Sequence, residues 1–202
     1  MARVALIDPD ATTGDIRAAL DALPVKLNIF RVMANAETCA IPAMRLGGAI
    51  LRRQQLGAAH RELLVLQAAQ LEGGVYEWRQ HVPIALGVGV TQPQVDALEA
   101  GNYVAEAFDA AERALLAFGR EVVENVRVGA AVFSGMKEHF SDREIVEAIL
   151  AIGFYMMMAR LTEATETDLA AGIAQWGAAH AAVDTLLGTS GGDTDLPQGA
   201  RP

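Results

Sequence analysis

The chain has 202 residues, 52% of them hydrophobic, and its 16 Lys and Arg against 25 Asp and Glu give a formal net charge of −9. Nucleic-acid-binding proteins need clustered positive charge to displace counterions, so this balance argues against nucleic acid and against an anionic membrane surface as partners. The single cysteine, Cys39, excludes an intramolecular disulfide, a zinc site built mainly from cysteine and any mechanism that cycles between a dithiol and an internal disulfide.

The distribution of proline and of helix-forming residues is typical of an all-α protein. No proline occurs between residues 94 and 196, Ala, Leu, Glu and Arg dominate, and no stretch alternates β-branched residues as a strand would. The sequence predicts helices near residues 13–22, 43–54, 58–72, 75–87, 93–100, 109–127, 130–140, 142–160 and 168–187.

Side chains that can cap a helix mark several of these predicted starts. A capping side chain accepts a hydrogen bond from a backbone N–H of the first turn, which has no partner within the helix. Such patterns precede three helices: Ser141 with Glu144, Asp109 with Glu112, and Thr91 before Pro93.

We expect a single all-α domain over residues 1–187 and a flexible tail over residues 188–202. The tail, GTSGGDTDLPQGARP, has too few apolar groups to offset the entropy cost of ordering it. The longest uncharged apolar run, residues 148–159, is too short for a bilayer, which needs about 20 residues, so we expect a buried core helix there. Nothing near the first residue resembles a signal peptide, and the sequence therefore predicts a cytoplasmic protein with no membrane partner.

Two of the predicted helices open with similar strings, HRELLV at residues 60–65 and DREIVE at residues 142–147. Either a duplicated helical unit or a common way of opening a helix accounts for this similarity. Only the first string is followed by a further titratable residue at this spacing. Glu77 lies fifteen residues after Glu62, whereas Ala159 lies fifteen residues after Glu144.

The most informative stretch runs from Glu62 to His81. Glu77 and His81 are four residues apart and share a helix face, with Trp78 on nearly the same face. A Gly-Gly break at residues 73–74 lets the two flanking helices fold against each other, which would bring Glu62 toward the Glu77–His81 face.

From the spacing alone, three interpretations of this stretch stay open. An imidazole beside a carboxylate can transfer protons near neutral pH. The same spacing also fits a surface Glu–His contact beside a core tryptophan. Glu62, Glu77 and His81 as metal ligands rank below proton transfer, because the HExxH spacing is absent.

Three segments of the chain resemble the carboxymuconolactone decarboxylase family, which includes the alkyl hydroperoxidase D-like proteins. They are GGVYEWRQHVPIA at residues 73–85, LNIFRVMA at residues 27–34 and the helix opening Arg61-Glu62-Leu63. The resemblance implies an all-α orthogonal helical bundle of two related helical units. It also implies a homo-oligomer, commonly a trimer or hexamer, with a site in the first unit near a subunit interface.

The resemblance also bears on the reaction. The peroxidase branch of the family uses a CxxC pair followed by His, with an upstream Glu. In this chain Gly74 and Glu77 stand at the two cysteine positions, whereas Glu62 and His81 match the acid and the histidine. A thiol peroxidase needs a sulfur that forms a sulfenate, so the decarboxylase branch fits better.

That branch implies a cofactor-independent lyase acting on a small carboxylated or lactone-type metabolite of aromatic catabolism, with no metal. His81 would donate or relay a proton, and Glu62 or Glu77 would fix its tautomer. The alternatives are a thiol-less hydroperoxidase-like relative and a non-catalytic helical oligomer. The Met-rich run at residues 156–158 is a further feature that favours an oligomer.

The same resemblance suggests residues that bind the substrate. Trp78 and Tyr76 would line the substrate pocket, and an arginine would bind the carboxylate through its planar guanidinium. Arg31, within the matching LNIFR stretch, is the first candidate, with Arg45 and Arg52 as the others.

Overall fold

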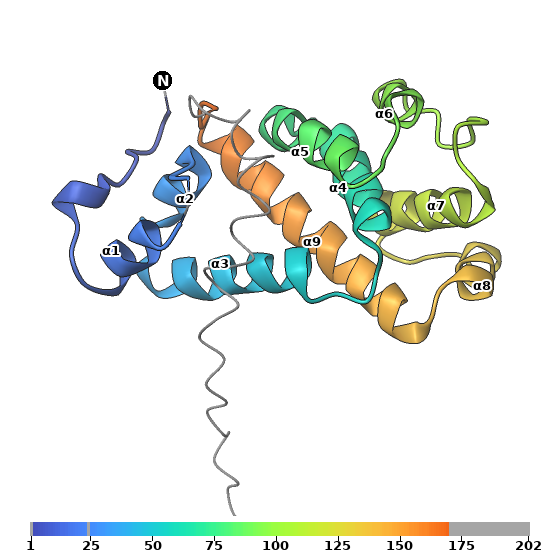
Figure 1. Cartoon of the computed structure of the whole chain (residues 1–202), viewed down its shortest axis with the longest axis horizontal. Helices are drawn as coiled ribbons and strands as arrows, with labels where there is room; N and C mark the ends of the chain where they lie inside the picture. The colour runs from blue at the N-terminus through green and yellow to red at the C-terminus, as the bar shows by residue number, and fades with distance from the viewer. Residues whose placement is uncertain (1, 24, 170–202) are drawn as a thin grey trace, which may run out of the picture.

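The computed structural model describes residues 2–23 and 25–169, and within these ranges every regular element is a helix (Figure 1). The all-α prediction is confirmed. The elements in chain order are the 3₁₀ helix η1 (Pro9–Ala11), α1 (Gly14–Asp21), α2 (Asn28–Met33), α3 (Glu37–Arg52), α4 (Ala58–Glu72), α5 (Val75–Gly87), α6 (Gln92–Glu99), α7 (Ala110–Asn125), α8 (Ala130–His139) and α9 (Asp142–Ala164).

The helices predicted over residues 58–72 and 75–87 match α4 and α5 at both ends. The sequence did not predict α2 or η1, and α9 continues four residues beyond its predicted end. Residues 168 and 169 are not helical, and the rest of the predicted helix at 168–187, like the predicted tail at 188–202, lies outside the described residues.

The start of α3 differs from the prediction, which placed it after Pro42. The structure has Pro42 inside the helix, where its missing N–H leaves the carbonyl of Thr38 without its usual helical donor. Ala40 and Ile50 are buried on one face of α3, and burial of this face offsets the lost hydrogen bond.

The predicted helix caps are present. The N–H of Glu112 donates to Asp109 Oδ1 at 2.8 Å, and the N–H of Asp109 donates to Glu112 Oε2 at 2.9 Å. Ser141 and Glu144 exchange the same pair of bonds at the start of α9. At the start of α6, the N–H of Thr91 donates to the side chain of the residue three positions on. These reciprocal bonds fix where the helices begin.

Helix α4 is the centre of the fold. All of its residues from Arg61 to Ala69 are buried, and it contacts α5, α6, α7 and α9. Apolar clusters join α4 to α7, α8 and α9 on one side and to α5, α6 and α7 on the other. A helix that is apolar all round must be buried all round, and each buried leucine contributes about 1.5–3 kcal/mol. Glu62, in the first turn of this segment, is therefore carried into the core.

Figure 1 shows α9 crossing the molecule diagonally, with α3 on one side and α4 and α5 on the other. Helices α1 and α2 lie at one end of the molecule, and α6, α7 and α8 lie at the other. The two helices that open with similar strings, α4 and α9, pack against each other. Their origin by duplication stays a prediction.

Of the helices in the described ranges, α9 alone is long and apolar enough to cross a membrane by length and composition. Half of its most apolar window is buried within this fold. Ala148, Ala151, Ile152 and Tyr155, from the run predicted as a core helix, are all buried.

The crossing of α4 and α7 leaves no room for a side chain at Gly119. A Cβ atom there would overlap the side-chain oxygen of Gln67 and lie 2.7 Å from Leu64 Cδ2. We expect Gly119→Ala to lower Tm by about 2–10 °C, since overpacking a core costs roughly 1–3 kcal/mol. Thermal unfolding followed by circular dichroism measures the shift. Gly135→Ala on α8 is the control, because a Cβ there meets open space, and it should leave Tm unchanged or slightly higher. Equal losses at the two positions would contradict the close crossing.

Candidate active site

The turn between α4 and α5 brings two distant parts of the sequence together. Gly73 has φ +68°, a left-handed conformation that glycine adopts without strain, and it ends α4. The N–H of Gly74 donates to the carbonyl of Ala69 at 2.8 Å, and α5 begins at Val75. The chain therefore reverses at this Gly-Gly pair as predicted, and α5 packs against α4.

This reversal places His81 of α5 against Glu62 of α4. The two atoms His81 Nδ1 and Glu62 Oε2 are 2.7 Å apart, and the residues are 4% and 0% exposed. An ionised carboxylate can only accept a hydrogen bond, so this contact assigns the proton to Nδ1. The second ring nitrogen, Nε2, makes no hydrogen bond to any described residue and is left as the group that can exchange a proton.

Arg61 completes a buried group of three charged or titratable side chains. Its Nε lies 3.2 Å from Glu62 Oε1, and its side chain is nearly as buried as that of His81. Burial opposes ionisation of Glu62, but His81 and Arg61 together hold the pKa of this carboxyl below its usual value. Glu62 is therefore an ionised carboxylate at neutral pH, and it is shared between an imidazole and a guanidinium.

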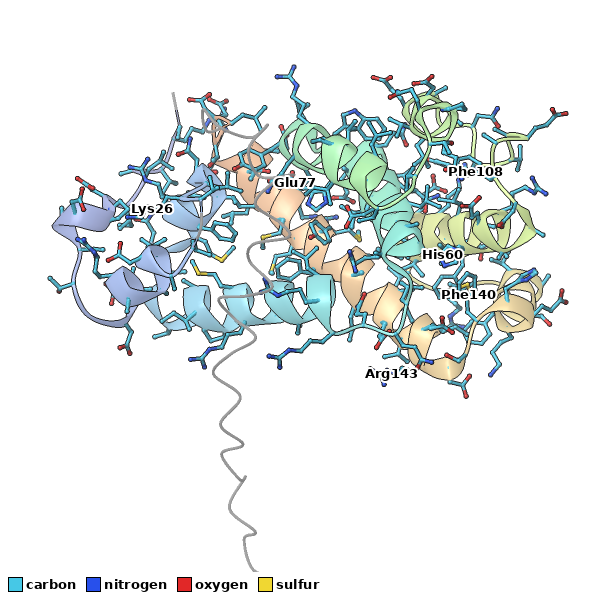
Figure 2. The ribbon with its side chains drawn as sticks, in the orientation of Figure 1. Lys26, His60, Glu77, Phe108, Phe140 and Arg143 are labelled. Atoms are coloured by element: carbon cyan, nitrogen blue, oxygen red, sulfur yellow. The ribbon has the colours of Figure 1, made fainter. Side chains whose placement is uncertain are left out.

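Glu77 has a different partner from the one expected. Its carboxyl does not bond to His81 but lies 3.0 and 3.1 Å from the hydroxyl of Thr162 on α9. Figure 2 labels Glu77 where α5 lies beside α9. Burial raises the pKa of Glu77. The hydroxyl of Thr162 has one proton and also lies 3.1 Å from two carbonyls of α9, those of Met158 and Ala159. In its contact with Glu77 the hydroxyl donates to the carboxyl, and this hydrogen bond opposes the rise in pKa that burial causes.

His81 lies in the wall of a cavity of about 1010 Å³. This volume is at the upper end of the range for small-molecule sites. Beside His81 the wall includes Gln80 of α5 and Tyr155 of α9. The α3 side of the cavity contributes three cationic side chains: Arg45, Arg52 and Arg53.

The aromatic ring beside the imidazole comes from α9 and not from Trp78. The ring centroids of Tyr155 and His81 are 4.7 Å apart at an interplanar angle of 81°. Burial, reinforced by the negative charge of Glu62, raises the pKa of Tyr155 well above its usual value. Trp78 is half-buried and packs in the cluster between α4, α5 and α6, away from the cavity. Sequence analysis missed Tyr155 because the helical pattern alone does not say which helix faces His81.

Two further predictions of substrate contacts are corrected by the structure. The hydroxyl of Tyr76 accepts a hydrogen bond from the N–H of Ile29 at 3.4 Å, and burial raises the pKa of Tyr76 to about 12. Arg31 donates from Nε to the carbonyl of Ile7 at 3.0 Å. Neither residue lines the cavity, so both serve to hold α2 and the N-terminal segment in place.

The position that carries the first cysteine in the related peroxidases is tightly packed here. A Cβ atom on Gly74 would lie 2.9 Å from the Cβ of Ala159 and 3.2 Å from Glu77 Oε2. A cysteine at this position would force α5 and α9 apart. The one cysteine, Cys39, is exposed on α3 and is not among the residues that line the cavity.

Within the described ranges, no group of three or more His, Cys, Asp or Glu side chains is arranged to hold a metal ion. Of the three residues considered as metal ligands, Glu62 and His81 lie together, whereas the carboxyl of Glu77 is bonded to Thr162.

Comparison with known proteins gives a match to one family model. Residues 42–120 match the model of the carboxymuconolactone decarboxylase family. The matched segment covers less than half of the chain. It contains Arg61, Glu62 and His81 and extends from within α3 into α7, so the resemblance seen in the sequence is confirmed. No curated protein matches the chain.

Solved structures share the fold of this chain. An alkylhydroperoxidase AhpD core protein from Ralstonia eutropha JMP134, described as an uncharacterized peroxidase-related protein, is 19% identical with a TM-score of 0.75, over 87% of this chain and 96% of that chain. A peroxidase-related protein from Silicibacter sp. TM1040 is 20% identical with a TM-score of 0.71, over 85% and 93%. A cysteine-to-alanine variant of the debrominase Bmp8, in complex with 2,3,4-tribromopyrrole, is 17% identical with a TM-score of 0.68, over 92% and 97%. At these identities the likeness shows the fold alone.

We expect Glu77→Gln to raise Tm more at about pH 8 than at about pH 5. A carboxyl whose pKa is higher in the folded chain stabilises the fold below its unfolded pKa and loses that contribution as the pH rises through the folded pKa. Glutamine keeps the shape and cannot ionise, so it removes the loss at high pH. Scanning fluorimetry at both pH values measures the difference, with Glu99→Gln, at an exposed position on α6, as the control. A gain in Tm that is independent of pH would show that the pKa of Glu77 is not raised in the folded chain.

Proposed function

We propose that the chain is a cofactor-independent lyase of the decarboxylase type that acts on a small carboxylated or lactone-type metabolite, with His81 as general acid and base. The observation that carries this proposal is the buried Glu62–His81 pair in the wall of the cavity, whose contact occupies Nδ1 and leaves Nε2 without a hydrogen bond to a described residue. The match of residues 42–120, which include Glu62 and His81, to the family model supports a catalytic role. The predicted cytoplasmic location is part of the same proposal.

The chemistry needs one well-placed acid. Decarboxylation breaks the bond between the carboxylate carbon and its neighbour, CO₂ leaves, and the electron pair stays in the conjugated system as a dienolate. The carbon that lost CO₂ then takes a proton from Nε2–H of a protonated His81, and solvent returns the proton. Glu62 stabilises the imidazolium form and keeps the ring in a single orientation, as a buried carboxylate does for a catalytic histidine.

Other groups in the cavity suit the remaining requirements of this reaction. The guanidinium groups of Arg45, Arg52 and Arg53 fit a carboxylate or a lactone carbonyl. The hydroxyl of Tyr155 makes no hydrogen bond within the described residues, and its raised pKa keeps it protonated. It is therefore a suitable donor to the oxygen that gains negative charge in the dienolate.

The two alternatives are less well supported. A hydroperoxidase mechanism needs a thiolate at the site, and Cys39 does not line the cavity. A purely structural oligomer gains nothing from an ionised Glu62 at 0% exposure, because taking a charge out of water costs several kcal/mol before its partners offset it. A catalytic histidine, in contrast, requires a buried carboxylate such as Glu62 to orient its ring beside the cavity.

Replacing His81 tests the proposal directly. Carboxylated five- and six-membered unsaturated lactones are the probes, and CO₂ release is the measurement. The wild-type chain is expected to release CO₂ and, in D₂O, to place one deuterium on the carbon that lost the carboxylate. His81→Asn keeps the shape without the titrating group and should slow turnover at least about a hundredfold.

His60→Asn is the matched control, because His60 stacks on Phe140 at 5.1 Å and does not line the cavity. It should keep full activity. Wild-type rates in the His81→Asn variant, or no CO₂ release from any of these lactones by the wild type, would contradict the proposal.

The arginines of α3 are expected to act on binding. Arg52→Gln or Arg45→Gln should lower kcat/KM by about tenfold or more, through KM alone or through KM and kcat together, since these arginines would hold the carboxylate or the lactone carbonyl of the substrate. Arg31→Gln is the control, because its guanidinium bonds to Ile7 and lies outside the cavity wall. Steady-state kinetics on the same lactones measures both parameters. An increase in KM confined to Arg31→Gln would contradict the assignment.

A further inference from the structure

The cavity beside His81 is larger than a carboxylated lactone ring requires. Its volume is about 1010 Å³, whereas pockets of about 300 Å³ already enclose small ligands. Its wall follows α3 from Ile41 to Arg52, a length of about 16 Å at the α-helical rise of about 1.5 Å per residue. The cavity therefore has room for a ligand that extends well beyond the group that reacts at His81.

The end of the cavity beside His81 is polar and includes an amide without a protein partner. Gln80 is 7% exposed and lines the cavity, and its side chain makes no hydrogen bond within the described residues. A ligand that displaces water from this wall removes the amide's solvent partner, so the ligand that fits best supplies a hydrogen bond in its place. Tyr155 and Arg52 line the same cavity. We call Gln80, His81, Tyr155 and Arg52 the polar end.

The packing of α9 shows where the polar end stops. Leu51, which precedes Arg52, packs against the cluster that contains Tyr155. Met158, about one turn further along α9, belongs instead to the cluster that contains Met33 of α2. Figure 1 shows α1 and α2 beside the first part of α3. The cavity therefore extends from the polar end toward α2 and the start of α3.

Methionines from three helices line this second part of the cavity. They are Met33 of α2, Met44 of α3 and Met158 of α9, three of the seven methionines in the chain. Methionine is unbranched and polarizable, so its side chain adapts to apolar groups of irregular shape. Asp15 and Arg45 also line this part, but both are exposed and they carry opposite charges. We call Met33, Met44 and Met158 the methionine wall.

We propose that this site takes a carboxylate that carries an extended apolar chain, with the carboxylate at the polar end and the chain along the methionine wall. The chain is about 9 Å long, the distance that α3 spans from Ile41 to Gly47 at the helical rise. Gln80 donates an amide N–H to a carboxylate or lactone oxygen, and the guanidinium of Arg52 stabilises the negative charge. The inference rests on the proposed function and narrows its substrate class.

Calorimetric titration with straight-chain alkanoates tests the ligand class without requiring a reaction. From butanoate to hexanoate and from hexanoate to octanoate, Kd should fall by about tenfold or more, because each buried methylene strengthens binding by about fourfold. 1-Octanol has the chain without the carboxylate, and it should bind at least about tenfold more weakly than octanoate. A Kd that does not change with chain length, or 1-octanol that binds as tightly as octanoate, would overturn the proposal.

Substitutions at the two ends test where each part of the ligand lies. Met44→Gln keeps the length of the side chain but places an amide in the methionine wall, so it should raise the Kd of octanoate by about tenfold and that of butanoate by less than about twofold. Gln80→Leu removes the amide of the polar end and should raise both Kd values by the same factor, about fivefold or more.

Met157→Gln is the matched control, because Met157 is 44% exposed on α9 and does not line the cavity. It should leave both Kd values unchanged. Equal losses for the two acids in Met44→Gln, or unchanged binding in Gln80→Leu, would overturn the proposal.

The same titrations separate this inference from the proposed reaction. Octanoate that binds as expected, with no CO₂ release from any lactone, would leave the ligand class supported and the reaction wrong. Unsubstituted lactones that release CO₂, with no effect of chain length on Kd or kcat/KM, would leave the reaction supported and this inference wrong. If both are right, a lactone with a hexyl substituent should have a kcat/KM at least about a hundredfold above that of the unsubstituted lactone.

Discussion

The buried carboxylate of Glu62 is the constraint on which the rest of the site depends. It lies in the central helix at 0% exposure and is ionised because His81 and Arg61 offset the cost of removing it from water. Removing one partner of such a group leaves an uncompensated buried charge and costs about 3–5 kcal/mol. The turn at residues 73–74 is the only connection between the two helices, so its left-handed glycine is needed for the charge balance of the core as much as for the turn.

Two carboxyls of one helical pair are driven in opposite directions by their surroundings. The pKa of Glu62 is lowered by its cationic neighbours against the effect of burial. Burial raises the pKa of Glu77, and the hydrogen bond from Thr162 only partly opposes that rise. The two acids lie on adjacent helices, yet their surroundings shift their pKa values in opposite directions. Glu77 bonds to α9 and does not touch His81.

The sequence predicted the parts of this arrangement that local patterns determine. Helical patterns located α4 and α5, a capping box marked the start of α9, and the Gly-Gly break indicated that Glu62 could approach the helix of His81. Properties set by packing between distant helices were not predictable. The spacing of Glu77 and His81 suggested a contact, but α9 supplies Thr162 to Glu77 and Tyr155 to His81. Packing between distant segments also decided which arginines lie at the cavity. Arg31, in the stretch that resembles the family, bonds to Ile7, whereas the arginines at α3 line the cavity.

Helix α9 forms one wall of the site. A helix is stiff along its length, so a contact that fixes α9 also fixes the level of Tyr155 and Thr162. The close approach of Gly74 to Ala159 fixes the position of α9, because α5 and α9 are in contact there. The resemblance places a cysteine of the peroxidase branch at this position. A site without sulfur has to work by holding an imidazole, a carboxylate and a ring in one geometry. The tight α5–α9 contact at Gly74 serves this requirement, because it fixes the helix of His81 against the helix that carries Tyr155.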